Sequence, residues 1–266
     1  MLIFASVIAA VFVWWLSTGT LLLVVRRADR KGGDAHAMAV LIGLPFLALG
    51  IAAVVLSLQQ QDLMSVYLGF LGALAVWGWA ELAFLTGIIA GPVRQDCPDD
   101  LDPQTRFGRA FGTVVYHEML LLVGLLGLVV VSSGAANRMA LATYMILFLA
   151  RISAKLNLFF GVPRINTEFV PDQLHHLKTY FRKGPVTIAF PIAITVLTAL
   201  LAVCVERLVA AETVVTQTGF ALLTALSALA LLEHWLMVVP LPDAKLWRWM
   251  LPAPKPITTK DENHGF

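Results

Sequence analysis

Charged residues are scarce in this chain, and their scarcity excludes several classes of protein. They make up 14% of the 266 residues, whereas a soluble domain usually carries about 25%. The composition therefore excludes an ordinary soluble enzyme and a disordered chain. A formal net charge of +2 excludes a protein that binds nucleic acid through a broad basic face. The only cysteines, Cys97 and Cys204, are too few for a secreted domain built on disulfides.

Long apolar runs make up most of the sequence. Hydrophobic residues amount to 59%, and the mean hydropathy is +0.80. A run of about 20 apolar residues crosses the hydrocarbon layer as a helix, because lipid offers its backbone groups no other partners. The sequence therefore predicts an all-α membrane protein, with one domain of seven transmembrane helices over residues 1–250 and a cytoplasmic tail over 251–266. The predicted spans are 1–25, 36–58, 63–90, 111–133, 139–160, 186–209 and 214–239.

Basic residues fall almost entirely on one side of these spans. Counting Lys and Arg in alternate connectors places fifteen on one side and two on the other, with Arg151 and Lys155 inside the fifth span. Short connectors rich in Lys and Arg stay in the cytoplasm during insertion. The amino terminus is therefore predicted outside, on the periplasmic side of a bacterial membrane, and the carboxyl terminus in the cytoplasm.

Two segments on the basic side are predicted to lie on the membrane surface. Over residues 171–184 we expect a short helix, because Leu174, Leu177 and Phe181 recur at helical spacing beside basic residues. Residues 245–249 mix tryptophan with Lys and Arg, a composition typical of the headgroup region. Both segments would hold the cytoplasmic connectors against the bilayer.

Ionisable residues inside the predicted spans are the strongest functional signal. A charged side chain at the centre of a spanning helix costs about 2.5–3.5 kcal/mol and therefore needs a partner or a use. Counted from the cytoplasmic ends of their helices, these residues lie at similar depths, so we expect one buried polar cluster. Its predicted members are Glu81, His117, Glu118, Arg151, Lys155, Asn157, Glu233 and His234.

The first two interpretations of this cluster need no organic ligand. One is an ion-pair network that fixes the register of the helices. The other is a metal site with Glu81, Glu118 and Glu233 as ligands, because carboxylates beside imidazoles suit zinc or non-haem iron. Against a metal, neighbours such as His117 and Glu118 point about 100° apart on a helix and do not face one ion together.

The other two interpretations involve a bound ligand or a moving ion. In one, His234 ligates the metal of a chlorophyll or haem, because Ala230, one turn earlier, leaves room for a flat macrocycle; His117 is the second candidate ligand. In the other, the acids mark a proton or ion pathway, although the chain shows no paired repeat. His175 and His176 are expected on a solvated face, or as a cap over the cluster.

Several segments carry a resemblance to a known family. They are residues 12–19 (FVWWLSTG), 151–158 (RISAKLNL), 161–169 (GVPRINTEF), 232–237 (LEHWLM) and 240–250 (PLPDAKLWRWM). In these segments, and over nearly its whole length, the chain resembles the photosynthetic complex assembly protein family PuhE of phototrophic purple bacteria.

The resemblance implies a multi-pass protein of the bacterial inner membrane, in its cytoplasmic or intracytoplasmic photosynthetic part. It implies assembly of the reaction centre and antenna, or modulation of bacteriochlorophyll supply, without a catalysed reaction. The implied partners are the lipid bilayer and reaction-centre subunits, antenna subunits or pigment-biosynthesis enzymes, while the composition excludes nucleic acid. Bacteriochlorophyll or a precursor is the first candidate cofactor and a transition metal the second. The alternatives are a membrane metalloenzyme acting on a lipid or tetrapyrrole, and a structural scaffold.

Overall fold

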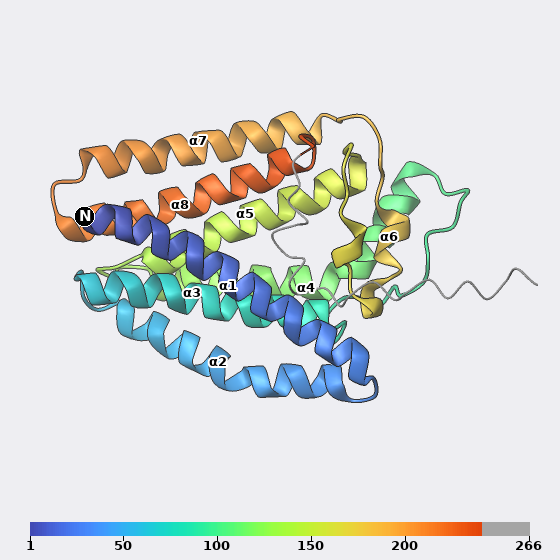
Figure 1. The fold of residues 1–266 in the computed structure, drawn as a ribbon, viewed down its shortest axis with the longest axis horizontal. Coiled ribbons are helices and arrows are strands. Elements are labelled where there is room, and N and C mark those ends of the chain that lie inside the picture. Colours follow the sequence, from blue (N-terminus) through green and yellow to red (C-terminus); the bar gives the residue numbers. More distant parts are fainter. Residues whose placement is uncertain (241–266) are drawn as a thin grey trace, which may run out of the picture.

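Helices form almost all of the regular structure (Figure 1). The computed structural model describes residues 1–240, and the surface segment predicted at 245–249 and the tail lie outside them. Over the described residues there is no β-strand, only an isolated bridge between Val162 and Lys183. The long helices are α1 (Leu2–Lys31), α2 (Ala35–Ser57), α3 (Leu63–Leu85), α4 (Pro103–Val131), α5 (Met139–Phe160), α7 (Ala189–Ala210) and α8 (Val214–Leu236).

The prediction of seven spans is confirmed, because each of these helices is long and apolar enough to cross a membrane. Several helix ends differ from the predicted ones, and α1 continues to Lys31 rather than ending at 25. Helix α4 begins at Pro103 rather than at 111, because Asp102 accepts hydrogen bonds from the backbone N–H groups of Gln104 and Thr105, both at 3.0 Å. Helix α3 ends at Leu85 rather than at 90, and the chain then turns through Gly87, whose φ is +73°.

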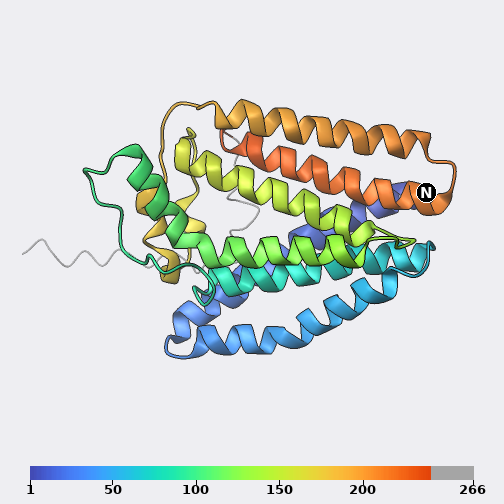
Figure 2. The ribbon, with the colours of Figure 1, turned by 180° about the vertical axis from the view of Figure 1, so that it is seen from behind.

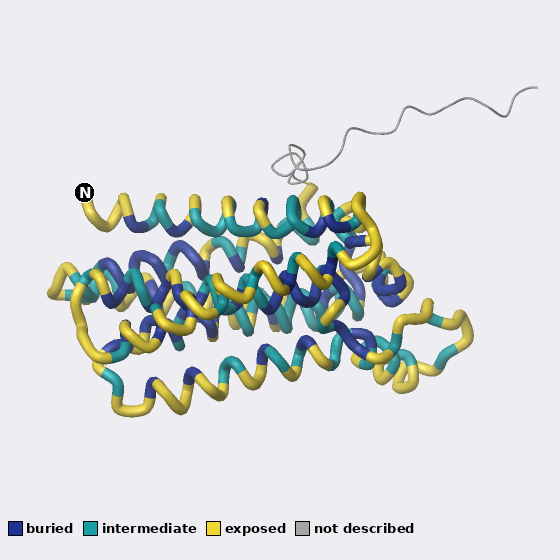
Figure 3. Tube along the Cα trace, turned by 90° about the horizontal axis from the view of Figure 1, so that it is seen from below, coloured by how far each residue is buried: buried dark blue, intermediate teal, exposed yellow. Residues whose placement is uncertain are grey.

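Helices α3 and α8 lie at the centre of the bundle. In their most apolar stretches 56% and 50% of the residues are buried, against 11% in α1 and 17% in α2. Exposed and buried residues alternate along the outer helices (Figure 3), so these helices turn one face inward and present an apolar face outward. An outward apolar face is the expected surface of a protein surrounded by lipid.

The connectors divide between two ends of the bundle (Figure 2). At one end, here called the loop end, lie the α1–α2 turn and the long connectors 86–102 and 161–188. The short turns 58–62, 132–138 and 211–213 lie at the opposite end. The connectors rich in Lys and Arg are thus together at the loop end, as the alternation of spans requires. Which end faces the cytoplasm stays a prediction.

The surface helix predicted over 171–184 is wrong. This segment contains the 3-10 turn Asp172–Leu174 and a single helical turn, α6 (Leu177–Tyr180), and is otherwise irregular. Its apolar side chains pack on protein rather than facing lipid, because Leu174 and Leu177 are buried against Phe84 and Ala90. The segment therefore closes the loop end of the bundle.

Candidate functional site

The connector after α3 inserts its backbone into the side of α4. The carbonyl oxygen of Ala90 accepts hydrogen bonds from the backbone N–H groups of Tyr116 at 2.9 Å and His117 at 3.1 Å, while Val93 N–H donates to the Gly112 carbonyl at 3.2 Å. A group inserted into a helical ladder bends the helix, and α4 bends here (Figure 2). The connector therefore fixes where α4 places His117.

A glycine makes this insertion possible. A Cβ atom on Gly91 would lie 2.1 Å from the carbonyl oxygen of Gly112 and 2.6 Å from the backbone of Thr113. No side chain fits at such a distance. Only glycine at position 91 lets the two backbones approach this closely.

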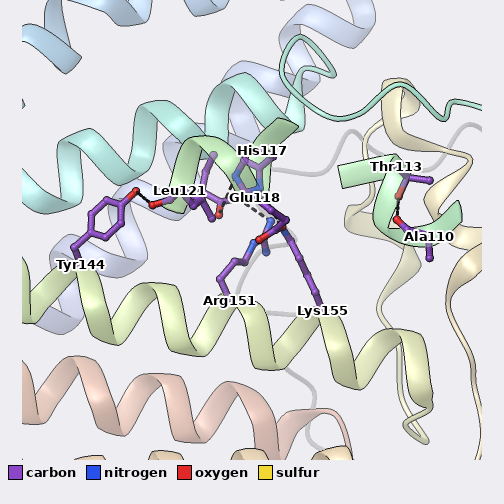
Figure 4. A network of polar contacts seen from close by, with 9 residues as sticks. Ala110, Thr113, His117, Glu118, Leu121, Tyr144, Arg151 and Lys155 are labelled. Atoms are coloured by element: carbon purple, nitrogen blue, oxygen red, sulfur yellow. Dashed lines mark hydrogen bonds and ion pairs between the residues drawn. The ribbon is translucent and has the colours of Figure 1, made fainter. Parts of the chain in front are cut away.

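Three helices contribute charged side chains to one network of buried and half-buried residues, here called the α3–α4–α5 network (Figure 4). Arg151 of α5 donates a hydrogen bond to Glu81 of α3 at 2.7 Å. Lys155, one turn further along α5, donates to Glu118 and, at 2.9 Å, to Nδ1 of His117, both on α4. The network consists of Glu81, His117, Glu118, Arg151 and Lys155.

The Lys155 contact determines which nitrogen of His117 carries the proton. An ammonium group only donates, so Nδ1 of His117 accepts and its Nε2 bears the hydrogen. Nε2 lies 3.8 Å from Oε1 of Glu81, and neither atom has a hydrogen-bond partner within the described part of the chain. His117 is completely buried, and its ring packs against that of Phe84 at 4.4 Å between centroids.

The charges of the network cancel. With a neutral His117, the carboxylates of Glu81 and Glu118 balance the cations of Arg151 and Lys155. Each acid has its own cation, and Phe84 covers both cations, with the Lys155 nitrogen 4.7 Å and the Arg151 guanidinium 5.6 Å from its ring centroid. Pairing of this kind offsets the cost of placing charges within a membrane-spanning bundle.

Two residues of the predicted cluster, Asn157 of α5 and His234 of α8, lie outside this network. Nε2 of His234 lies 2.7 Å from the Ser153 hydroxyl, and its Nδ1 lies 2.8 Å from the Ala230 carbonyl oxygen. Asn157 donates to the backbone carbonyl of Ser153 at 2.9 Å. Both ring nitrogens of His234 are therefore engaged within the protein, and a macrocycle metal could reach Nε2 only by displacing Ser153.

Glu233 belongs neither to the α3–α4–α5 network nor to the contacts that His234 and Asn157 make with Ser153. Its neighbour His234 is buried, but Glu233 itself is exposed. Within residues 1–240 no group of three His, Cys, Asp or Glu side chains is arranged to hold a metal ion. The expected ligands Glu81, Glu118 and Glu233 are thus not gathered around one point.

The two histidines of the 161–188 connector lie apart from the network. His175 is exposed and His176 is buried. Burial, reinforced by the nearby charge of Arg94, lowers the pKa of His176 below its ordinary value of 6.5. His176 is therefore neutral near pH 7, with Nε2 lacking a partner among the described residues.

Sequence reasoning missed Ser153, Phe84 and the backbone of Ala90. A signal for Ser153 existed: Ser153 and Asn157 are one turn apart, as are Arg151 and Lys155, and the two pairs are offset by two residues, which places them on different faces of a helix. For Phe84 and Ala90 the sequence has no comparable signal, since their roles arise from the packing of a connector.

The fold and this geometry define an integral membrane protein whose seven helices enclose a neutral network of charged side chains. A family profile described as "Protein of unknown function (DUF3623)" matches residues 1–258, and the chain belongs to this family. A Rhodobacter capsulatus protein named "Uncharacterized 30.4 kDa protein in puhA 5'region" is 48% identical over 246 residues, which cover 92% of this chain and 90% of that protein. No solved structure matches the chain.

Proposed function

We propose that this chain is a non-catalytic membrane factor for assembly of the bacterial photosynthetic reaction centre and antenna, or for the supply of bacteriochlorophyll to them. The single observation that carries the proposal is the 48% identical relative, whose name places it in the puhA 5′ region. That position points to photosynthesis, in agreement with the resemblance of segments such as 151–158 and 161–169 to the PuhE family.

The structure supports a role in binding rather than in catalysis. The network between α3, α4 and α5 is neutral and internally paired, so it serves to hold three helices in register. The surface available to partners is the apolar outside of the bundle and the loop end. We place the loop end in the cytoplasm of the inner or intracytoplasmic membrane, where pigment-biosynthesis enzymes and nascent subunits have access to it.

The experiment is a gene deletion with replacement. The gene of the Rhodobacter capsulatus relative is deleted, and the strain receives either an empty vector or this chain. Under phototrophic growth we expect less mature reaction centre and antenna per cell in the deletion strain, with recovery when this chain is expressed. Free pigment, measured in the same cells, distinguishes a failure of assembly, in which pigment accumulates, from a failure of supply, in which it falls. Unchanged reaction centre, antenna and pigment in the deletion strain would refute the proposal.

A further inference from the structure

An open groove of about 500 Å³ lies at the loop end, between the start of α4 and the end of α5. Three phenylalanines form its apolar wall: Phe107 packs edge-on against Phe159 at 5.4 Å and stacks with Phe160 at 6.4 Å between ring centroids. Arg106 and Arg182 supply its charge, and no acidic side chain from the described residues lines it. The groove thus combines two cations with an aromatic, half-exposed wall.

Arg106 is held in place by the protein. Its guanidinium donates a hydrogen bond to the Tyr180 carbonyl at 2.6 Å and lies 4.4 Å from the centre of the Phe159 ring. Neither partner is an anion, so both contacts orient the cation without neutralising it.

Arg182 is positioned by its backbone. Its N–H donates to the Leu158 carbonyl at 2.9 Å, and its own carbonyl accepts from Val162 N–H at 3.2 Å, which fixes it beside the last turn of α5. Across the described part of the chain its side chain makes no ion pair or hydrogen bond. Among residues 1–240, therefore, two guanidinium groups face one groove without a counter-anion.

The groove lies where the bundle leaves the hydrocarbon layer. Phe160 ends α5, and Phe107 lies about one turn outside the fourth predicted span, which begins at 111. Phe107 and Phe160 are 43% and 40% exposed, large fractions for aromatic rings unless lipid covers them. At this depth the ligands at hand have an anionic head and an apolar chain, and basic pockets between helix ends bind such lipids.

We propose that this groove binds one anionic phospholipid, with its phosphate between Arg106 and Arg182 and an acyl chain along Phe107 and Phe160. The two cations favour an anionic headgroup over a neutral one. The aromatic wall favours a molecule with an acyl chain over a free anion such as phosphate. The site uses none of the residues of the α3–α4–α5 network and does not depend on the proposed role in assembly.

The test measures lipid binding by native mass spectrometry of the full-length protein in a non-ionic detergent. Phosphatidylglycerol and phosphatidylcholine with the same acyl chains are titrated separately, and inorganic phosphate is added as a chain-free anion. We expect one phosphatidylglycerol per protein, bound more tightly than phosphatidylcholine, and little displacement by phosphate. Arg182→Gln should weaken phosphatidylglycerol binding roughly fivefold, the effect of about 1 kcal/mol for one cation near a membrane surface.

Matched variants separate the groove from general surface charge. Arg27→Gln removes one exposed cation from the same end of the bundle and should leave the preference unchanged, whereas Phe160→Ala should weaken both lipids alike. Arg106→Gln would also lose the Tyr180 contact and could misfold for that reason, so Arg182→Gln is the variant that tests the charge of the groove. Equal binding of the two lipids, an equal loss in Arg27→Gln, or phosphate binding as tight as phosphatidylglycerol would each overturn the proposal, the first pointing to a different occupant such as an acidic protein segment.

Discussion

Lys155 is the one side chain that contacts both α4 members of the buried network, His117 and Glu118. Lys155→Met removes the cation and leaves the Glu118 carboxylate without its partner inside the bundle. Breaking a buried ion pair in this way costs about 3 kcal/mol, because the remaining charge is uncompensated. We expect a clearly lower midpoint of thermal unfolding for the purified protein in detergent.

Two controls accompany this substitution. In the double variant Lys155→Met with Glu118→Gln no charge is left unpaired, so much of the lost stability should return. Arg207→Gln breaks an ion pair with Glu206 that is more than 60% exposed on both sides and should shift the midpoint little. If Lys155→Met and Arg207→Gln behave alike, the network does not stabilise the fold.

Gly91 is the residue on which the contact between connector and α4 depends. Gly91→Ala would drive a methyl group into the backbone of Gly112 and Thr113, so we expect the connector to leave α4 and the yield of folded protein to fall severalfold. Gly108→Ala is the matched control, because its Cβ meets nothing within 4 Å and it lies within a helix. That variant should be neutral or gain up to about 1 kcal/mol. Size-exclusion chromatography of detergent extracts compares the two, and equal yields would contradict the role of Gly91.

Among the elements, α5 organises the polar interior. Arg151 and Lys155 on one face reach α3 and α4, while Ser153 and Asn157 lie on another face, where Ser153 meets His234 of α8. Because a charged side chain in lipid is costly, the sequence alone predicted that the charged residues within the spans have partners. The sequence did not reveal which partners, because the rotation of each helix about its axis is set by packing.

For α8, too, the sequence did not reveal the rotation of the helix about its axis. Glu233 and His234 are adjacent, so their side chains point about 100° apart, and the sequence does not tell which of the two faces the interior. The structure buries His234 and exposes Glu233. The surface helix predicted over 171–184 was wrong for a related reason. Apolar residues at helical spacing indicate that a segment packs on an apolar surface, but they do not distinguish lipid from protein. Here the surface is formed by Phe84 and Ala90.

The segment that closes the loop end should loosen in acid. His176 has a lowered pKa because it is buried, and Arg94, Asp96 and His175 are the charged or titratable groups around it. The released segment binds a proton at higher pH than the docked one, so docking is fully stable above about pH 6.5 and loses stability as the pH falls. Hydrogen exchange over residues 172–180, corrected for its intrinsic rate, should be faster at about pH 5.5 than at about pH 7.5.

Substituting His176 and His175 separately shows which of them causes the loosening in acid. His176→Gln cannot take up a proton and should remove the pH dependence, whereas His175→Gln, at the exposed neighbouring position, should retain it. Acid loosening that persists in His176→Gln would show that another group is responsible.

At the scale of the whole molecule, the orientation in the membrane can be tested with single cysteines. In a Cys97→Ser background, one variant carries Gln60→Cys at the short-turn end and another Asp100→Cys at the loop end, both exposed positions; Cys204 is buried. From the excess of Lys and Arg at the loop end we expect a membrane-impermeant maleimide to label the first variant in intact cells. The second should react only in inverted vesicles. The reverse pattern would overturn the predicted topology.

Most of the architecture was predictable because the bilayer imposes a length and a hydropathy on every span. Hence the ranges 139–160 and 214–236 agree closely with the predicted ones. The connectors obey no such rule. Helix α4 begins at Pro103 rather than at 111, and the insertion of Ala90 beside His117 depends on backbone contacts between segments distant in sequence.

The insertion of the Ala90 carbonyl into α4 couples the connector to the charged network. A single carbonyl oxygen, that of Ala90, ties the connector to the peptide N–H of His117, whose imidazole meets Lys155. A displacement of the connector at Ala90 would thus move the backbone of α4 at the position that carries the imidazole. The place of an imidazole among the charges of α3 and α5 is therefore set by the main chain of a segment that belongs to none of the seven long helices.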